Sequence, residues 1–169
     1  MILAAAARLA AACLDQLAPY CEQIEIAGSI RRRRHWCNDV DLACLLKEGR
    51  RPALIDRLRQ RCQIVTEGAE NLIVKLPCGN QLDLFLARPP YRDLLDSRPT
   101  NFGSIFLCRT GSREHNIFLV EHAKTLGLVW KPYQGVFDAD GYCLASATEA
   151  DIFKALDLPF IPPEQRERP

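Results

Sequence analysis

The sequence of 169 residues lacks several features that mark common classes of protein. Its 22 basic and 21 acidic residues leave a formal net charge of +1, so the whole molecule has no charge that favours nucleic acid. It contains no Cys-x-x-Cys pair and only three histidines, which argues against a structural zinc site. No run approaches the roughly 20 apolar residues of a membrane-spanning helix. These absences predict a globular protein without a membrane partner, whose basic surface is local.

Eight cysteines are present, and most lie in apolar runs such as DLACLL and IFLCR, where a reduced cysteine acts as a small core residue. We therefore expect a reducing compartment, the cytoplasm. The Ala-rich beginning lacks the basic start of a signal peptide and is interrupted by Arg8 and Asp15. It predicts an amphipathic helix that ends at Pro19.

The order of sequence periods predicts an α+β fold with two lobes. Five segments of the first lobe read as strands, at 22–28, 38–46, 63–68, 71–77 and 81–87. A helical period covers residues 53–62, where Pro52 suits the first turn. We therefore expect a mixed β-sheet with flanking helices in residues 1–89.

The Pro-rich segment 87–99 predicts the boundary between the lobes. Beyond it the patterns predict two helices, one hairpin and a short helix, at 101–108, 112–125, 128–144 and 151–156. Thr148 with Asp151 three residues later is typical of a capping box. We expect residues 90–169 to form a small α/β subdomain.

The stretch GSIRRRRHWCNDVDL, residues 28–42, places two carboxylates on one predicted strand. Asp39 and Asp41 are two residues apart and therefore point to the same face. Their repulsion would be relieved by a divalent cation, and Mg²⁺ favours a few carboxylates together with phosphates. Asp83 lies among leucines on a later strand, where an acid costs free energy unless it is paired or bound to metal. If the two strands are neighbours, the three acids could hold two metal ions for an in-line displacement at phosphorus.

Phosphate recognition is indicated by the beginning of the same stretch. Gly28 allows a backbone to approach an anion closely, and Ser29 supplies a hydroxyl and an amide. The arginines that follow could neutralise a triphosphate. Residues 28–61 carry ten basic and four acidic residues, so this window is the local basic patch.

Each feature has an ordinary structural alternative when it is taken alone. A D-x-D pair can be a solvated face, Arg33 and Arg34 can belong to an exposed loop, and Asp83 can be an acid of an edge strand. Asn116 can be an ordinary polar residue of a helix. The joint occurrence of all the parts in one order favours the phosphoryl-transfer interpretation.

In this combination the sequence resembles the family X DNA polymerases, within the wider nucleotidyltransferase superfamily. The superfamily pattern is a Gly-Ser turn, a D-x-D pair and a third acid on a later strand. The segment RTGSREHN, residues 109–116, is similar to the family's thumb, where a T-G-S turn precedes the helix that lines the nucleotide pocket. The ending at 147–167 is also similar to the family's C-terminus, and the resemblance extends over residues 25–167.

The resemblance implies a palm followed by a thumb-like subdomain, and a DNA-directed DNA polymerase that transfers a nucleotide from a dNTP to a primer 3′-hydroxyl with release of pyrophosphate. Asp39 and Asp41 would bind both of two Mg²⁺ ions, with Mn²⁺ as a substitute, and Asp83 would bind the catalytic ion. The residues implied in nucleotide binding are Gly28, Ser29, Arg32, Arg109, Gly111, Ser112, Arg113 and Asn116.

Four positions depart from the family pattern. The aromatic pair that usually precedes T-G-S is replaced by Cys108 and Arg109, so the choice between deoxyribose and ribose is open. Arg113 stands where the family often has an acid or a lysine, and Gln81 stands where an arginine often assists the 3′-hydroxyl. Base contacts and primer activation are therefore expected to differ.

Because Met1 begins at the helix directly before the Gly-Ser strand, we expect a minimal, monomeric palm-plus-thumb form without lyase or fingers domains. Its partners would be dNTP and primer-template or gapped DNA, with gap filling in DNA repair as one setting. Binding should depend on the basic patch and fall steeply with salt. The expected DNA contacts are Arg31, Arg33, Arg34 and His35.

Two alternatives come from other classes. The first is a nucleotidyltransferase that acts without a template, or on RNA or a small molecule. The second is a DNA-binding module without catalysis, against which the three aspartates argue.

Overall fold

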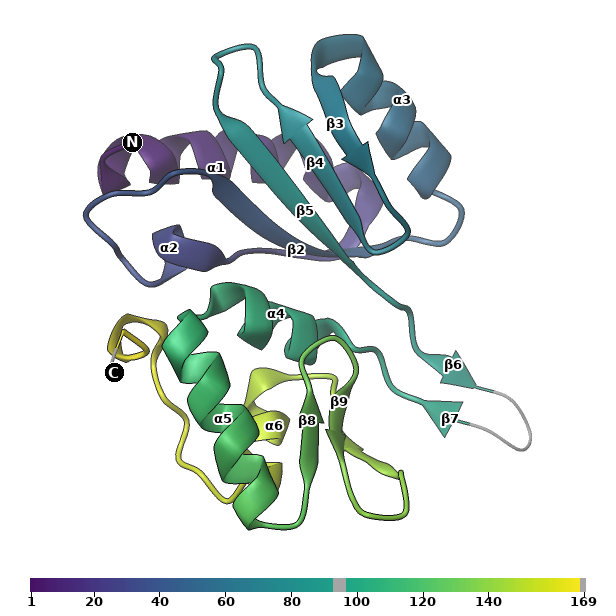
Figure 1. Cartoon of the computed structure of the whole chain (residues 1–169). Helices are drawn as coiled ribbons and strands as arrows, with labels where there is room; N and C mark the ends of the chain where they lie inside the picture. The colour runs from purple at the N-terminus through teal and green to yellow at the C-terminus, as the bar shows by residue number, and fades with distance from the viewer. Residues whose placement is uncertain (93–96, 168–169) are drawn as a thin grey trace. The chain divides into compact units, whose positions relative to one another are not determined.

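The computed structural model describes residues 1–92 and 97–167. The chain divides into two compact units, Met1–Ala87 and Arg88–Pro169, which are described separately. Figure 1 shows both units with most of their helices and strands labelled.

The first unit is a five-stranded sheet with helices. Its elements are α1 (Leu3–Leu17), η1 (Ala18–Tyr20), β1 (Cys21–Ile26), α2 (Gly28–Arg31), β2 (Val40–Leu46), α3 (Arg51–Arg61), β3 (Gln63–Glu67), β4 (Asn71–Lys75) and β5 (Gln81–Ala87). The strand order is β1-β2-β5-β4-β3, in which β2 and β5 are parallel and the other neighbours are antiparallel. The expected α+β class with a mixed sheet is therefore confirmed.

Helices α1 and α3 cover the face of this sheet that carries its apolar side chains. The core of the first unit joins the buried faces of α1 and α3 to one face of the sheet, which includes Leu42 on β2 and Leu84 on β5. Figure 1 shows both helices on the same side of the strands. Since successive side chains alternate between faces, Asp41 and Asp83 belong to the opposite face.

The second unit combines helices with two small sheets. Its elements are β6 (Tyr91–Arg92), β7 (Ser97–Arg98), α4 (Phe102–Thr110), α5 (Arg113–Thr125), β8 (Val129–Lys131), β9 (Gly135–Phe137), β10 (Cys143–Ala145), α6 (Glu149–Ala155) and η2 (Pro163–Gln165). Within the Pro-rich segment 87–99, residues 93–96 lie outside the described residues.

The hairpin predicted over residues 128–144 is present as β9 and β10, and β8 adds a third strand that gives the sheet β10-β9-β8. The N–H of Gln134 donates to the carbonyl of Lys131 at 2.8 Å and closes a turn between β8 and β9. A second turn, in which the N–H of Gly141 donates to Asp138 at 3.2 Å, follows β9. Both turns contain turn-forming residues, so the chain reverses direction twice in this segment.

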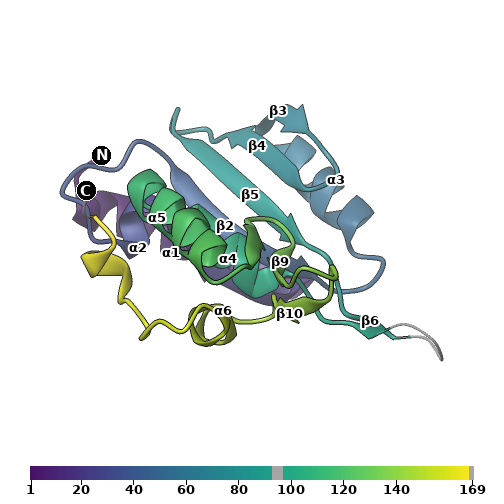
Figure 2. The same cartoon turned by 60° about the horizontal axis from the view of Figure 1, so that its bottom comes forward.

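Two side-chain caps define helices of the second unit. The hydroxyl of Ser112 accepts from the N–H of His115 at the start of α5, and Thr148 accepts from the N–H of Asp151 at the start of α6. The predicted cap at Thr148 is therefore confirmed. Figure 2 shows the segment after α6 running back past α5 toward the C-terminus. None of the helices in the described part of the chain is long and apolar enough to span a membrane.

Candidate active site

Two of the three predicted carboxylates are brought together by strand pairing. Asp41 of β2 and Asp83 of β5 are directly opposite each other in the parallel ladder. Their side chains leave the same face of neighbouring strands, which lie about 4.8 Å apart. Both are half-buried, and the side-chain amide of Gln81 donates to Oδ1 of Asp83 at 2.8 Å. The ladder therefore concentrates negative charge on the sheet face opposite α1 and α3.

Asp39 lies at the entrance to the same strand. The structure begins β2 at Val40, so Asp39 precedes the strand and the prediction that it is a strand residue is wrong by one position. It is half-buried and lies two residues before Asp41. The loop before it is held to the N-terminus, since Cys37 and Met1 exchange backbone hydrogen bonds of 2.9 and 2.7 Å.

Gly28 lies against the carboxylate of Asp41. Its φ of +60° favours glycine, and a Cβ built there would overlap Oδ2 of Asp41 and lie 2.7 Å from its Cγ. The N–H of Ala27 donates to the carbonyl of Asp41 at 2.9 Å. The Gly-Ser segment, predicted as a turn, forms the one-turn helix α2 beside the acidic pair.

The hydroxyl of Ser29 is a buried group that could accept a hydrogen bond from a ligand or donate one to it. Its Oγ is buried and has no hydrogen-bond partner within the described residues. A buried hydroxyl without a partner costs about 1–3 kcal/mol. A phosphate oxygen or a metal-bound oxygen would remove this cost, so the position fits the predicted phosphate contact.

The four arginines follow Ser29 around a tight bend. The N–H of Arg32 donates to the carbonyl of Gly28 at 3.2 Å, and that of Arg34 donates to Ser29 at 3.0 Å. Arg33 has a φ of +58°, and its side chain, like those of Arg34 and His35, is exposed, whereas Arg31 and Arg32 are half-buried. The four arginines therefore lie at the end of helix α2 and in the bend that follows it.

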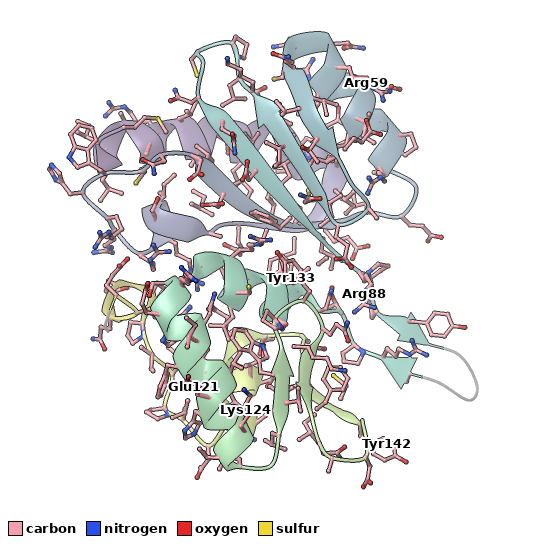
Figure 3. All side chains as sticks on the ribbon, in the orientation of Figure 1. Arg59, Arg88, Glu121, Lys124, Tyr133 and Tyr142 are labelled. Carbon is pink, nitrogen blue, oxygen red and sulfur yellow. The ribbon has the colours of Figure 1, made fainter. Side chains whose placement is uncertain are left out.

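Part of the wider basic patch has structural roles. Arg51 donates to the carbonyls of Gly68 and Ala69 at 2.6 and 2.8 Å. Arg59, labelled in Figure 3, pairs with Glu67 at 2.9 Å. The positive charge available for a partner is therefore smaller than the count over residues 28–61.

Among the described residues, the three predicted acids do not form one set of metal ligands. Across residues 1–92 and 97–167, no group of three or more His, Cys, Asp or Glu residues is arranged as a set of metal ligands. Of the three predicted acids, only Asp41 and Asp83 are placed side by side by the pairing of β2 with β5.

The predicted residues of the second unit surround the turn between α4 and α5. Gly111 has a φ of +69°, and the peptide bond between Gly111 and Ser112 is cis. The buried hydroxyl of Ser112 donates to the carbonyl of Arg166 at 2.6 Å in addition to capping α5. Its side chain therefore holds the turn, while Arg113 begins α5 with an exposed side chain.

Arg109 and Asn116 lie on either side of this turn. The guanidinium of Arg109 stacks on Tyr133, with its Cζ 4.9 Å from the ring centroid, and Figure 3 labels Tyr133 in the turn between β8 and β9. The side-chain amide of Asn116 donates to the carbonyl of Cys108 at 2.8 Å, and its buried Oδ1 has no partner among the described residues. Oδ1 is therefore an acceptor that a ligand donor could satisfy.

A buried polar cluster behind the turn was missed by the sequence analysis. Arg166 is 1% exposed, its Nη1 lies 2.7 Å from Oε1 of Glu149, and its Nε donates to Ile161 at 2.8 Å. His115 packs near this pair, and its buried Nε2 has no partner in the described part of the chain. Glu149 and Arg166 are far apart in sequence and carry no local signal. They fix the segment to which Ser112 is bonded.

The pH dependence of stability should report on His115. Burial, followed by the charge of Arg166, lowers the pKa of His115 from 6.5 to about 4. Between these values the unfolded chain takes up a proton that the folded chain does not, so stability falls as the pH drops from 6.5 to about 4. We expect a loss of about 3 kcal/mol, measured by urea unfolding.

The control for this effect is the exposed His35. His115→Gln should remove most of the slope between pH 6.5 and 4, whereas His35→Gln should leave it in place. An unchanged slope in the His115 variant would contradict the assignment.

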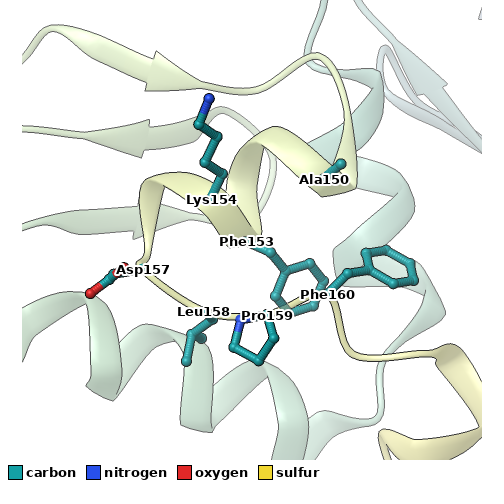
Figure 4. A pocket seen from close by; sticks show the side chains of 7 residues that line it. All are labelled: Ala150, Phe153, Lys154, Asp157, Leu158, Pro159 and Phe160. Carbon is teal, nitrogen blue, oxygen red and sulfur yellow. The ribbon is translucent and has the colours of Figure 1, made fainter.

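A separate pocket of about 500 Å³ lies beside the end of α6. Figure 4 shows that it is lined by side chains between Ala150 and Phe160. It contains none of the predicted site residues, so it is not part of the candidate active site.

Comparison with known proteins connects these features to DNA polymerases. Residues 105–167 match the family model of the DNA polymerase beta thumb, so most of the second unit is similar to that domain. The chain is also 30% identical, over 163 residues, to DNA polymerase lambda of Rattus norvegicus. The match covers 83% of this chain and 28% of the relative. The resemblance to family X DNA polymerases is therefore confirmed.

Proposed function

We propose that the chain is a nucleotidyltransferase that acts as a family X DNA polymerase, adding nucleotides from dNTPs to a primer 3′-hydroxyl and releasing pyrophosphate. The observation that carries the proposal is the direct pairing of Asp41 with Asp83 on parallel strands, with Gly28 against Asp41. The similarity to DNA polymerase lambda and the thumb match support it. In this proposal residues 1–89 form a palm and 90–169 a thumb.

The acidic pair suits a divalent cation, because a bound cation relieves the repulsion between two neighbouring carboxylates. Asp41 and Asp83, with Asp39 at the entrance to β2, would hold Mg²⁺ or Mn²⁺. When bound, such ions would neutralise phosphate charge and lower the pKa of a hydroxyl.

The chain's own groups would position the reactants. Ser29 would donate its hydroxyl to a phosphate oxygen, and Arg32 would neutralise the pyrophosphate as it forms. The 3′-oxygen forms a bond to the α-phosphorus while the bond to pyrophosphate breaks, and the hydroxyl proton passes to Asp83 or solvent. In the second unit, Gly111 would approach the sugar and Asn116 would offer Oδ1 to the base.

The residues before the T-G-S turn favour a second candidate function, nucleotide transfer without a template or to an RNA end. Arg109, one of the two residues that replace the family's usual aromatic pair, stacks on Tyr133 beside the turn. A guanidinium offers hydrogen-bond donors that an aromatic ring does not, so a ribose hydroxyl could be accepted there.

The test is single-nucleotide extension of a labelled primer on a template and on a one-nucleotide gap, with each dNTP and each NTP. We expect addition of the template-matched dNTP, stoichiometric release of pyrophosphate and loss of product as salt rises. The ratio of dNTP to NTP incorporation, compared between the wild type and Arg109→Phe, would measure the part that Arg109 plays in sugar choice.

Other outcomes decide between the alternatives. Addition that ignores the template base would replace the polymerase with an untemplated transferase. DNA binding without turnover in Mg²⁺ or Mn²⁺ would leave a binding module.

A further inference from the structure

Thiols of the first unit gather where the strand pair β3 and β4 ends. Cys62 directly precedes β3, and Cys78 lies in the turn between β4 and β5. Gln63 pairs with Lys75, so an extension of this antiparallel ladder places Cys62 beside Leu76, two residues from Cys78. The two thiols interact electrostatically, since burial and then Cys78 raise the pKa of Cys62.

Hydrogen bonds from Asn80 favour the ionised form of the Cys78 thiol. The turn is closed by the N–H of Leu76, which donates to Asn80 at 2.9 Å, and that of Gly79, which donates to Leu76 at 2.8 Å. The side-chain amide of Asn80 donates to Sγ of Cys78 at 3.3 Å, and Cys78 is exposed. The backbone N–H of Asn80, followed by this amide, lowers the pKa of Cys78.

We propose that Cys78 and Cys62 form a peroxide-sensitive thiol pair, in which Cys78 is oxidised first and Cys62 then closes a disulfide. Asn80 donates to the thiolate that a hydroperoxide requires, and a second thiol lies at the same end of the sheet. The inference does not depend on the proposed polymerase activity.

The chemistry balances in two steps. The Cys78 thiolate attacks one oxygen of the hydroperoxide, so that an S–O bond forms, the O–O bond breaks, and water or an alcohol leaves with a proton. Cys78 is then a sulfenic acid, oxidised by two electrons. The sulfur of Cys62 attacks the sulfur of Cys78, the S–S bond forms, and the S–O bond breaks with release of water.

Cys62 is a better second thiol than Cys13. Cys13 lies on α1 and is only 8% exposed, and burial is the largest cause that raises its pKa to about 11. Cys62 is half-buried and precedes β3 at a chain junction, where a small movement is easier than within α1.

The experiment exposes the fully reduced chain to limiting hydrogen peroxide and maps the products by mass spectrometry. Trypsin separates the two cysteines into fragments 62–75 and 76–92, so the disulfide joins two different peptides. We expect this crosslink as the main product. At pH 7, alkylation of Cys78 by iodoacetamide should be about tenfold faster than that of Cys143, an exposed cysteine of the second unit.

Two variants separate reactivity from simple exposure. Cys62→Ser should abolish the crosslink and let the sulfenic acid of Cys78 accumulate, trapped by dimedone. Asn80→Asp keeps the side-chain shape but replaces the donor with a carboxylate, so alkylation of Cys78 should slow toward the rate of Cys143. Asn80→Ala gives the same test if the first variant folds poorly.

The proposal is overturned if Cys78 reacts no faster than Cys143, or if Asn80→Asp and Asn80→Ala leave its rate unchanged. A crosslink that survives in Cys62→Ser, or none in the wild type, would remove the pairing with Cys62.

Discussion

Asp83→Asn is expected to reduce nucleotide addition on the order of 10³-fold while leaving the fold intact. Asparagine has the same shape, but it removes one of the two charges that face each other on β2 and β5. Losing a metal-binding carboxylate removes several kcal/mol of transition-state stabilisation, and each 1.36 kcal/mol is about tenfold in rate. Single-turnover primer extension under saturating dNTP would measure this loss.

A second measurement separates catalysis from general damage. The increase in Tm on adding Mn²⁺ should be smaller in Asp83→Asn than in the wild type, because one of the two carboxylates that would hold the ion has lost its charge. Asp56→Asn is the matched control, because Asp56 is an exposed carboxylate of α3 on the same unit. Equal activity in Asp83→Asn and Asp56→Asn would refute the role of the acidic pair.

Local patterns were enough to predict the five strands and the two long helices of the first unit, but not the short helix α2. Alternation in segments such as QLDLFLA and the helical period after Pro52 depend on neighbours in sequence, and both elements are present. The pairing of Asp41 with Asp83 could only be stated as a condition, because no local signal fixes which strands are neighbours. A parallel pair needs a crossover, and here α3, β3 and β4 lie between its strands.

Non-local contacts explain the remaining gaps. Ser112 was predicted as a nucleotide-binding residue, and no local pattern indicated that its hydroxyl caps α5 and donates to the carbonyl of Arg166. The stacking of Arg109 on Tyr133 also joins separate elements. Charged residues are rarely buried unless they are paired, so composition favoured a surface position for Arg166.

Arg166→Met is expected to lower the free energy of unfolding of the second unit by about 3–5 kcal/mol, because Glu149 is left as a buried carboxylate without its ion-pair partner. Urea unfolding followed by the fluorescence of Trp130, which is 3% exposed, would measure this loss. A Trp36→Phe background removes the signal of the exposed tryptophan of the first unit.

The double variant Glu149→Gln with Arg166→Met tests whether the loss comes from the stranded charge. Removing both charges should recover a large part of the stability, because the paired charges cost desolvation and Met fills much of the space between Phe153 and Phe160.

Arg166 also lowers the pKa of His115 while Glu149 raises it, so Arg166→Met should reduce the loss of stability between pH 6.5 and 4. Glu121→Gln, at an exposed position of α5 labelled in Figure 3, should change neither quantity. A single variant as stable as wild type would show that the Arg166 ion pair does not hold the segment that bonds Ser112.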